Sequence, residues 1–593
     1  MTDVPLTPAD GAVDGRPSHP FTAPRGLAWS DEARHRLRSL TPTDPGSGRV
    51  HTVPTPRPPI VSVLTPVYNT PVGVLAECIA SVTAQTYERW ELCLVDDASP
   101  SAGPWDELQR WAALDDRIRI ARRNRNGGIV AASNDCAALA TGEIVSLLDH
   151  DDMLAPHALD RVVEAFGAGA DVDYVYSDED LVHPVAGRIS PFYKPDWSPE
   201  RFRGQMYCCH LSSIRRSLFD DVGGFREGFD GSQDWDLMWR VAERARRIVH
   251  IPEVLYHWRI VETSVLAGES VKPYAYDAAR RVLEEHCARV GIRGEVVESE
   301  RRGHFRVRRD VEAEPLTSIV VPTRGDRGVV FGERRTMVVE AVRSVLQRST
   351  WTELEIVVVA DTATPDAVLD ELLAIGGDRL RIVEWSGPFD FSAKCNLGAA
   401  VAHGELLVFL NDDTEVITAD WLDTMSGFLR EPDVGAVGPH LLFEDGRLQC
   451  GGHVLIGGNP GHLMFGQDPH SERNRMALWL DREVAGVTAA CLMTRATTFA
   501  EVGGFSPDLP GNYNDVDLCL KLRDAGYRVI ATPHARLYHF ESISRDPTVS
   551  DRELATLRAR WQVELSSDPY YSIRHLDGLD CYPEPVGYPA VSG

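Results

Sequence analysis

Three carboxylates stand close together in the sequence at the end of one apolar run. Residues 144–148 are apolar except for one serine, and Asp149, Asp151 and Asp152 follow directly. Neighbouring carboxylates repel one another when all are ionised, and a hard divalent cation with oxygen ligands relieves that repulsion. Because Asp is also common in turns and at helix starts, a single cluster of this kind is equally compatible with a structural role.

The arrangement occurs a second time, which favours the chemical interpretation. Residues 406–410 form another apolar run, and Asn411-Asp412-Asp413 follows it. A short apolar run containing β-branched residues is typical of a buried parallel strand. The carboxyl ends of such strands are where open α/β sheets bind their ligands. The sequence therefore predicts two ligand sites, one in each half of the chain.

The segments around the first cluster predict the fold that positions it. Strand-type and helix-type patterns alternate before Asp149, and Pro66 is expected to end the first strand. This alternation predicts an α/β fold with a Rossmann-like, mostly parallel sheet and right-handed crossovers. The expected strands are residues 60–66, 90–97, 117–121 and 144–148, and the expected helices are residues 72–85 and 129–140.

The series restarts near residue 316, with motifs in the same order and at nearly constant offset. Such collinear matches indicate an internal duplication, with two copies of one fold of about 220 residues each. The second copy has 18 more residues between Asn411 and Gly503 than the first has between Asp149 and Gly223, in a region rich in Gly and His. The matched pairs include Asp97 with Asp361, Asn134 with Asn396, Gly223-Gly224-Phe225 with Gly503-Gly504-Phe505, Asp234 with Asp515, and His257 with His539.

The repeat and the changes in composition predict five segments. The first is a flexible arm rich in Pro and Gly with one short helix near residues 29–37, and the last is a helix followed by a tail. The segments are an arm at 1–57, a first α/β domain at 58–262, a connector at 263–315, a second α/β domain at 316–546, and a C-terminal segment at 547–593.

Composition excludes several classes of protein. With 593 residues, 43% hydrophobic and 25% charged, the chain has the composition of a soluble globular protein. A net charge of −27 disfavours nucleic acid and anionic membranes as general partners. The 11 cysteines include no CxxC pair, which favours reduced thiols and predicts no zinc site. Neither a run of 18 apolar residues nor a signal peptide is visible, so the cytoplasm is the expected location.

These motifs resemble family 2 glycosyltransferases with a GT-A fold. The first copy carries them as VSVLTPVYN, VDDASP, GEIVSLLDHDD, GGF and QDWDL. The second copy, with VVVAD, GELLVFLNDD, GGF and NDVDL, is similar to the rhamnosyltransferase-like members of bacterial polysaccharide assembly. The resemblance covers about 60–260 and 316–545. It implies two tandem GT-A domains.

The resemblance implies an inverting transfer of a sugar from a UDP-, dTDP- or GDP-linked donor to a glycan or lipid-linked glycan, with Mg²⁺ or Mn²⁺. A lipid-linked acceptor would also be compatible with peripheral association at the inner face of the plasma membrane. The implied roles are nucleotide or diphosphate contacts for Asp97, Asp149, Asp361, Asp412 and Arg122, metal binding for Asp149, Asp151, Asp413, His257 and His539, and catalytic bases at Asp234 and Asp515.

Several alternatives stay open at this point. Asp236 and Asp517 could replace Asp234 and Asp515 as bases, and carboxylates also stabilise helix N-termini without any catalytic role. Asn411 stands where the first copy has an Asp, so the second copy could be an acceptor-binding or assembly module beside one active domain.

Other enzyme classes fit the sequence less well. A sugar nucleotidyltransferase would need a Gly-rich basic loop near the first strand, and a Rossmann dehydrogenase would need GxGxxG there. A glycosidase would explain paired carboxylates but not the repeat.

Overall fold

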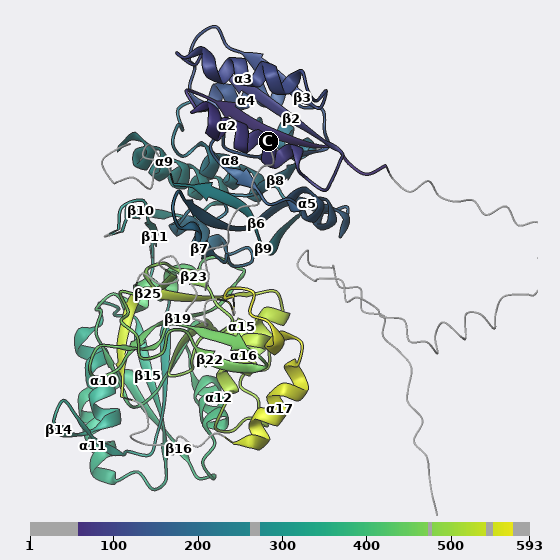
Figure 1. Ribbon diagram of the computed structural model, residues 1–593. Coiled ribbons are helices and arrows are strands. Elements are labelled where there is room, and N and C mark those ends of the chain that lie inside the picture. The colour runs from purple at the N-terminus through teal and green to yellow at the C-terminus, as the bar shows by residue number, and fades with distance from the viewer. Residues whose placement is uncertain are drawn as a thin grey trace, which may run out of the picture. The chain divides into compact units, whose positions relative to one another are not determined.

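Two large sheets, each flanked by helices, make up the protein (Figure 1). The computed structural model describes residues 57–260, 273–299, 301–471, 477–540, 550–572 and 574. The helix expected near residues 29–37 lies outside these residues. Among the described residues, no helix is both long and apolar enough to cross a membrane.

The first sheet follows the predicted alternation of strands and helices. Its strands are β1 (Val61–Val67), β2 (Trp90–Asp96), β3 (Ile118–Arg122), β4 (Ile144–Leu147), β5 (Met153–Leu154), β6 (Val172–His183), β7 (Gly187–Phe192), β8 (Ser212–Arg215) and β9 (Arg247–Arg259). The helices around it are α2 (Val72–Thr83), α3 (Ala102–Ala112), α4 (Ile129–Leu139), α5 (Ala158–Gly167), α6 (Pro199–Gly204), α7 (Arg216–Asp221) and α8 (Gln233–Ala242).

A connecting region separates the two sheets in the sequence. It contains the helix α9 (Pro273–Val290) and an antiparallel pair of strands, β10 (Gly294–Glu298) and β11 (Phe305–Arg309).

The second sheet repeats the first. Its strands are β12 (Thr317–Thr323), β15 (Leu354–Asp361), β16 (Leu380–Trp385), β17 (Leu406–Leu410), β18 (Thr414–Val416), β19 (Val434–Leu442), β20 (Leu448–Cys450), β23 (Arg482–Glu483), β24 (Cys491–Arg495) and β25 (Arg528–His539). Its helices are α10 (Met337–Arg348), α11 (Asp366–Gly376), α12 (Phe391–Val401), α13 (Trp421–Phe428), α15 (Ala496–Glu501), α16 (Asn514–Asp524) and α17 (Asp551–Trp561). Two small hairpins accompany it, β13 (Arg327–Val330) with β14 (Glu333–Thr336), and β21 (His453–Ile456) with β22 (Asn459–His462).

The strand order is the same in both sheets, which supports the predicted duplication. It reads β3-β2-β1-β4-β8-β6-β9-β5 in the first and β16-β15-β12-β17-β24-β19-β25-β18 in the second. The strands β1 to β4 pair in parallel, as expected, whereas β8 enters antiparallel between β4 and β6. The predicted fold class, α/β with two GT-A sheets, is confirmed, and the sheets are mixed.

Alternating side chains of the central strand place the cores on both faces of the first sheet. Val61 and Val63 pack with α2, α3 and α5, while Leu64 packs with α4 and α8 on the other face. This alternation is the period of two expected of a strand buried on both faces. In the second sheet, Ile319 and Val320 likewise pack into two different cores, one on each face.

One strand end differs from its prediction. Pro66 was expected to end β1, but the strand runs on to Val67, and Pro66 pairs with Val95 of β2. Proline is tolerated there because the pairing of β1 with β4 has already ended at Leu64.

Candidate active sites

The first cluster of carboxylates lies where β4 ends. Ligand atoms of Asp149, Asp152 and His210 lie within 4.8 Å of one another. The Asp149 side chain is 46% exposed, and its Oδ2 lies 4.0 Å from Nε2 of His210. Because β4 ends at Leu147, the next residues leave the sheet at the edge where α/β proteins bind ligands. Carboxylate oxygens with one imidazole nitrogen suit Mg²⁺ or Mn²⁺.

The electrostatics of this cluster fit a cation. Burial, followed by the charges of Asp149 and Asp151, raises the pKa of Asp152 well above its ordinary value. The hydroxyl of Tyr256 donates to Oδ2 of Asp152 at 2.6 Å. Burial lowers the pKa of His210 to about 4, so its imidazole is neutral near pH 7 and has a lone pair for a metal. The neighbouring negative charges that help to raise the pKa of Asp152 are what a divalent cation would relieve.

Two predicted metal ligands of the first half, Asp151 and His257, are not in the group of Asp149, Asp152 and His210. Nδ1 of His257 lies 2.7 Å from Oδ1 of Asp180, its neighbour across β9 and β6, and not in the group around Asp149. The strand register turns the His257 ring toward Asp180, and its role as a metal ligand stays a prediction. Asp151 lies close by, with Oδ1 3.7 Å from Nδ1 of His150.

The predicted base of the first half, Asp234, lies in the first turn of α8. Burial raises its pKa to about 6, close to the value that suits a general base near neutral pH. The charges of Asp234 and Asp149 both raise the pKa of the Cys209 thiol, after burial, so this thiol is near both carboxylates. Ser232 is at the N-cap position of α8, but its hydroxyl donates to the carbonyl of Ala275 instead of capping the helix.

The alternative base of the first half, Asp236, has a structural role. Its carboxylate is fully buried and forms ion pairs with Arg226 and Arg240. In the second half, Asp517 is likewise fully buried and pairs with Arg560 and Lys521. A carboxylate enclosed by cations is a weak base, which leaves Asp234 and Asp515 as the candidates.

Predicted nucleotide contacts of the first half are engaged within the protein. Asp97 accepts hydrogen bonds from the backbone of Gly127 and Gly128, both at 2.9 Å, and pairs with Arg123. Arg122 pairs with Asp96 at 2.9 Å. Asp97 therefore holds the loop before α4, and Arg122 is paired with a buried carboxylate. A nucleotide contact by either side chain stays a prediction.

The second half contains a cavity of about 350 Å³. Its lining brings together most of the predicted site of this half, including Asn411, Asp412, Asp413, Asp515 and His539. Nε2 of His539 lies 3.3 Å from Oδ1 of Asp413 and 3.2 Å from Nδ2 of Asn411. These side chains come from the ends of β17, β25 and α16, which the sheet order brings to one edge.

Asp412, in the lining of this cavity, and Asp361, which contacts the lining residue Lys394, both have close polar partners. Burial, followed by the charge of Asp413, raises the pKa of Asp412 to about 7, and Thr323 donates to its Oδ2 at 2.6 Å. Asp361 lies 2.8 Å from the ammonium nitrogen of Lys394, which also donates to the backbone of Thr323. Asp361 is thus paired with a cation, and its predicted contact with the nucleotide stays a prediction.

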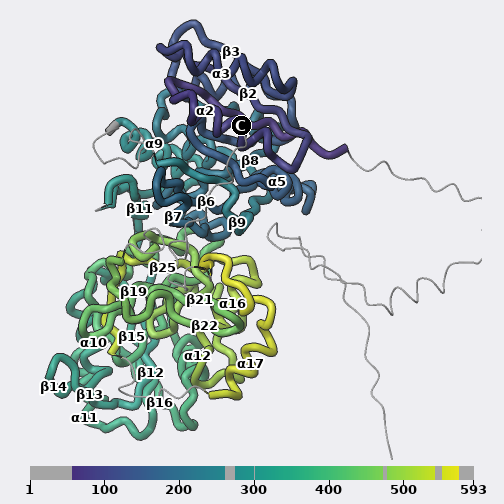
Figure 2. Tube along the Cα trace, in the orientation of Figure 1, coloured from purple at the N-terminus to yellow at the C-terminus, as the bar shows by residue number. Residues whose placement is uncertain are grey.

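The predicted base of the second half, Asp515, lies in the first turn of α16 and accepts from the backbone of Ala489 at 3.1 Å. Its Oδ2 lies 3.9 Å from Nε2 of His453. His453 belongs to the hairpin of β21 and β22, whose strands are labelled in Figure 2. Burial lowers the pKa of His453 to about 4. His453 and His462 both line the cavity.

His210, His453 and Lys394 are the residues that reasoning from the sequence missed. His210 lies in the loop between α6 and β8, which carries no motif, so only the antiparallel course of β8 brings it to Asp149. His453 lies in the insert region, which the sequence analysis described only as rich in Gly and His. Lys394 stands two residues before Asn396, within a matched motif, and that position could have indicated a partner for Asp361.

Comparison with known proteins identifies the family. The model of the family "Glycosyl transferase family 2" matches residues 62–223 and 318–503, more than half of the chain. The protein therefore belongs to glycosyl transferase family 2. The predicted enzyme class, glycosyltransferase, is confirmed, and the two matches fall on the two sheets.

Curated relatives extend beyond this chain. An uncharacterized protein, y4gI of Sinorhizobium fredii, is 39% identical over 530 residues, which is 87% of this chain and 57% of the relative. The O-antigen biosynthesis protein RfbC of Myxococcus xanthus is 36% identical over 88% of this chain and 41% of the relative. A chondroitin synthase of Escherichia coli is 28% identical over 40% of this chain and 34% of the relative. The chain thus spans about half the length of the first two.

Proposed function

We propose that each half is a metal-dependent glycosyltransferase site, and that the two sites together extend a bacterial surface glycan with inversion at the transferred sugar. The domains would be residues 58–262 and 316–546. The observation that carries the proposal is the cavity of the second half, whose lining includes Asn411, Asp413, His539 and Asp515. One relative, RfbC, is an O-antigen biosynthesis protein, which supports a surface glycan as the acceptor.

The donor sets fit a divalent cation in both halves. Asp149, Asp152 and His210 offer oxygen and nitrogen ligands in the first half, and Asp413 with His539 offers them in the second. When bound, Mg²⁺ or Mn²⁺ would neutralise the diphosphate of a nucleotide sugar and stabilise it as a leaving group. Asn411 contributes an uncharged oxygen to the second set, so we expect weaker metal binding there.

The base at each helix start would accept the proton of the acceptor hydroxyl. Asp234, with a pKa of about 6, is ionised near neutral pH and basic enough to take that proton as the new bond forms. Asp515 occupies the matching position on α16 and faces the cavity. Attack on the face opposite the diphosphate would invert the configuration at the sugar carbon.

In the second candidate function, only one half of the protein is catalytically active. In that reading the first domain transfers the sugar, and the second binds the acceptor or supports assembly. Two observations favour it: Asn411 replaces a carboxylate, and Lys394 already neutralises Asp361.

Titration calorimetry with UDP, GDP and dTDP in the presence of Mn²⁺ separates the two readings. The proteins would be wild type, Asp151→Asn and Asp413→Asn, with Asp277→Asn as a control because that carboxylate is exposed on α9. Two sites in the wild type, one lost with each of the first two variants, would support the proposal.

The other outcomes are equally informative. One site that is lost only with Asp151→Asn would make the second half a support module. If none of the three nucleotides bound in a metal-dependent manner, the proposed donor sites would be refuted in both halves.

A further inference from the structure

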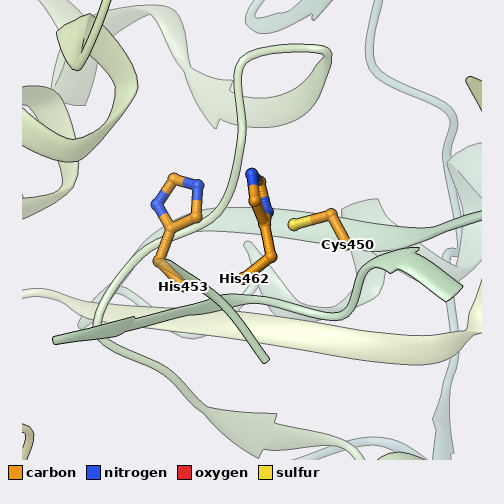
Figure 3. Close-up of side chains that lie close together, drawn as sticks. All are labelled: Cys450, His453 and His462. Atoms are coloured by element: carbon orange, nitrogen blue, oxygen red, sulfur yellow. The ribbon is translucent and has the colours of Figure 1, made fainter. Parts of the chain in front are cut away.

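A second set of metal-type ligands lies in the insert of the second half. Cys450, His453 and His462 each offer one ligand atom, and these atoms lie within 4.8 Å of one another. Figure 3 shows the two imidazole rings beside the Cys450 sulfur. From this arrangement we propose that the second half binds a transition metal of the zinc type, at a site separate in its ligands from the proposed Mg²⁺ or Mn²⁺ site.

The hairpin fixes two of the three ligands. His453 and His462 are directly opposite one another in the antiparallel pair β21–β22, and their ring centroids lie 5.2 Å apart. Opposite residues of an antiparallel pair project from the same face, so the two rings share one side of the hairpin. The backbone of His453 is held by a hydrogen bond to Gly486 at 2.7 Å.

A two-glycine turn delivers the third ligand. Cys450 ends β20, and Gly451 and Gly452 lead directly into β21. Gly452 has φ +108, and a Cβ there would come within 2.7 Å of Val484, so this tight turn requires glycine. The turn brings the sulfur of Cys450 back to the hairpin, and Cys450 is 1% exposed.

The surroundings also favour a ligand. His453 is 5% exposed, and in Figure 3 its Nε2 is the ring nitrogen on the side of His462 and Cys450. The same Nε2 lies 3.9 Å from Oδ2 of Asp515, so a buried nitrogen faces a thiol, an imidazole and a carboxylate, which are all ligands that zinc accepts. Ligand atoms around tetrahedral zinc lie about 3.4 to 3.8 Å apart, so small side-chain movements would close the set.

The chemistry of the donors distinguishes this site from the carboxylate sites. One thiolate and two imidazoles prefer zinc, whereas oxygen donors prefer Mg²⁺ or Mn²⁺. Three protein ligands leave a fourth position open, and His453 and His462 line the same cavity as Asp515. The fourth ligand would therefore be an oxygen atom of water or of another molecule in the cavity, since Asp515 is the proposed base of this half. Reasoning from CxxC spacing predicted no zinc site because these ligands come from a strand end and a hairpin.

Cobalt substitution tests the site without any nucleotide or sugar. The full-length protein, stripped with a chelator, would be titrated with Co²⁺, and the thiolate-to-cobalt charge-transfer absorption in the near ultraviolet would be recorded. We expect a band that saturates at one equivalent and is abolished by added Zn²⁺. The band should be absent in Cys450→Ser and present in Cys287→Ser, a control that alters a buried cysteine of α9.

A second variant keeps the test valid if Cys450→Ser fails to fold. His462→Gln alters the partly exposed ligand of the hairpin and should weaken Zn²⁺ binding at least tenfold, while His470→Gln, an exposed histidine, should not. A Co²⁺ titration without a thiolate band, or a band unchanged in Cys450→Ser, would overturn the proposal. Because the readout needs no donor sugar, its failure would leave the proposed glycosyltransferase function untouched.

Discussion

Asn134 binds both backbone polar groups of Phe225. Its Nδ2 donates to the carbonyl of Phe225 at 2.9 Å, and its Oδ1 accepts from the amide of the same residue at 3.0 Å. Asn396 and Phe505 repeat the pair at 2.9 and 3.0 Å. A Cβ on Gly224 would come within 2.9 Å of Asn134 Oδ1, which explains the glycine before each phenylalanine. The motif is therefore a clamp that fixes the chain before the helix of the base.

Breaking this clamp should loosen the base of the first half. Asn134→Ala removes two hydrogen bonds at a partly buried position, and we expect a loss of about 2 kcal/mol in the free energy of unfolding. Urea denaturation measures the loss, and hydrogen exchange around Phe225 localises it. Asn124→Ala, at an exposed position, should change stability by less than about 0.5 kcal/mol. Equal effects of both variants would contradict the clamp.

Asp234→Asn should lower activity and raise stability. The folded-state pKa of about 6 exceeds the ordinary value of 3.8, so the folded protein binds the proton more tightly than the unfolded chain. The unfolding free energy therefore falls as pH rises from about 4 to 6, by up to about 3 kcal/mol, and the loss persists above pH 6. Asparagine removes that penalty.

The measurements for this variant are a denaturation series and a rate profile. Stability should exceed that of the wild type at about pH 8 and match it near pH 4. Turnover should fall by about 10² to 10⁴ and lose its acidic limb near pH 6. A variant that is less stable at pH 8, or one that retains full turnover, would exclude Asp234 as a buried base.

The histidine beside Asp149 should control metal binding in the first half. His210→Ala removes a neutral imidazole from the cluster, and we expect Mn²⁺ affinity there to fall about tenfold or more. His257→Ala removes the 2.7 Å contact with Asp180 instead, so it should cost about 1 to 3 kcal/mol of stability and leave Mn²⁺ affinity unchanged. Titration calorimetry with Mn²⁺ on both variants makes the comparison, and a reversed pattern would restore His257 as the ligand.

Lys394→Met should destabilise the second half. The ammonium group is 2% exposed, and its loss would leave Asp361 without its cation, at a cost of about 3 kcal/mol. The double variant Lys394→Met with Asp361→Asn should recover much of that loss, because the uncompensated charge is gone. Urea denaturation of the two single variants and the double variant completes the cycle. Additive losses would show that the pair does not interact.

The elements with strong periodicity could be predicted from the sequence. Apolar runs located β1, β2 and β4, and the repeat of their motifs predicted the second sheet. Neither pattern carries information on which distant strand pairs with β4, so the antiparallel entry of β8 was not predicted. Since His210 reaches Asp149 only through β8, its place in the site was beyond sequence reasoning. The place of Pro66 inside β1 was not predictable either, because a strand tolerates proline only where the pairing with its neighbour has ended.

The sequence identified polar residues of the site, but it did not predict which groups they contact. Asp234 and Asp515 were identified because the motifs QDWDL and NDVDL resemble those of family 2 glycosyltransferases. Asp97 and Asp361 were matched by position, but their partners differ: glycine amides and an arginine in one, a lysine in the other. Partner choice is set by packing between segments far apart in the chain, which no local pattern encodes.

The insert of the second half lies between β19 and β24, two neighbouring strands of the sheet. A chain that leaves and re-enters a sheet through adjacent strands can gain or lose residues there without disturbing the ladder. The end of β17, with Asn411 and Asp413, lies outside this excursion in the sequence. Natural variation of the excursion could therefore change what the cavity accepts while the carboxylate end stays as it is, so the two halves could diverge in selectivity from one ancestral scaffold.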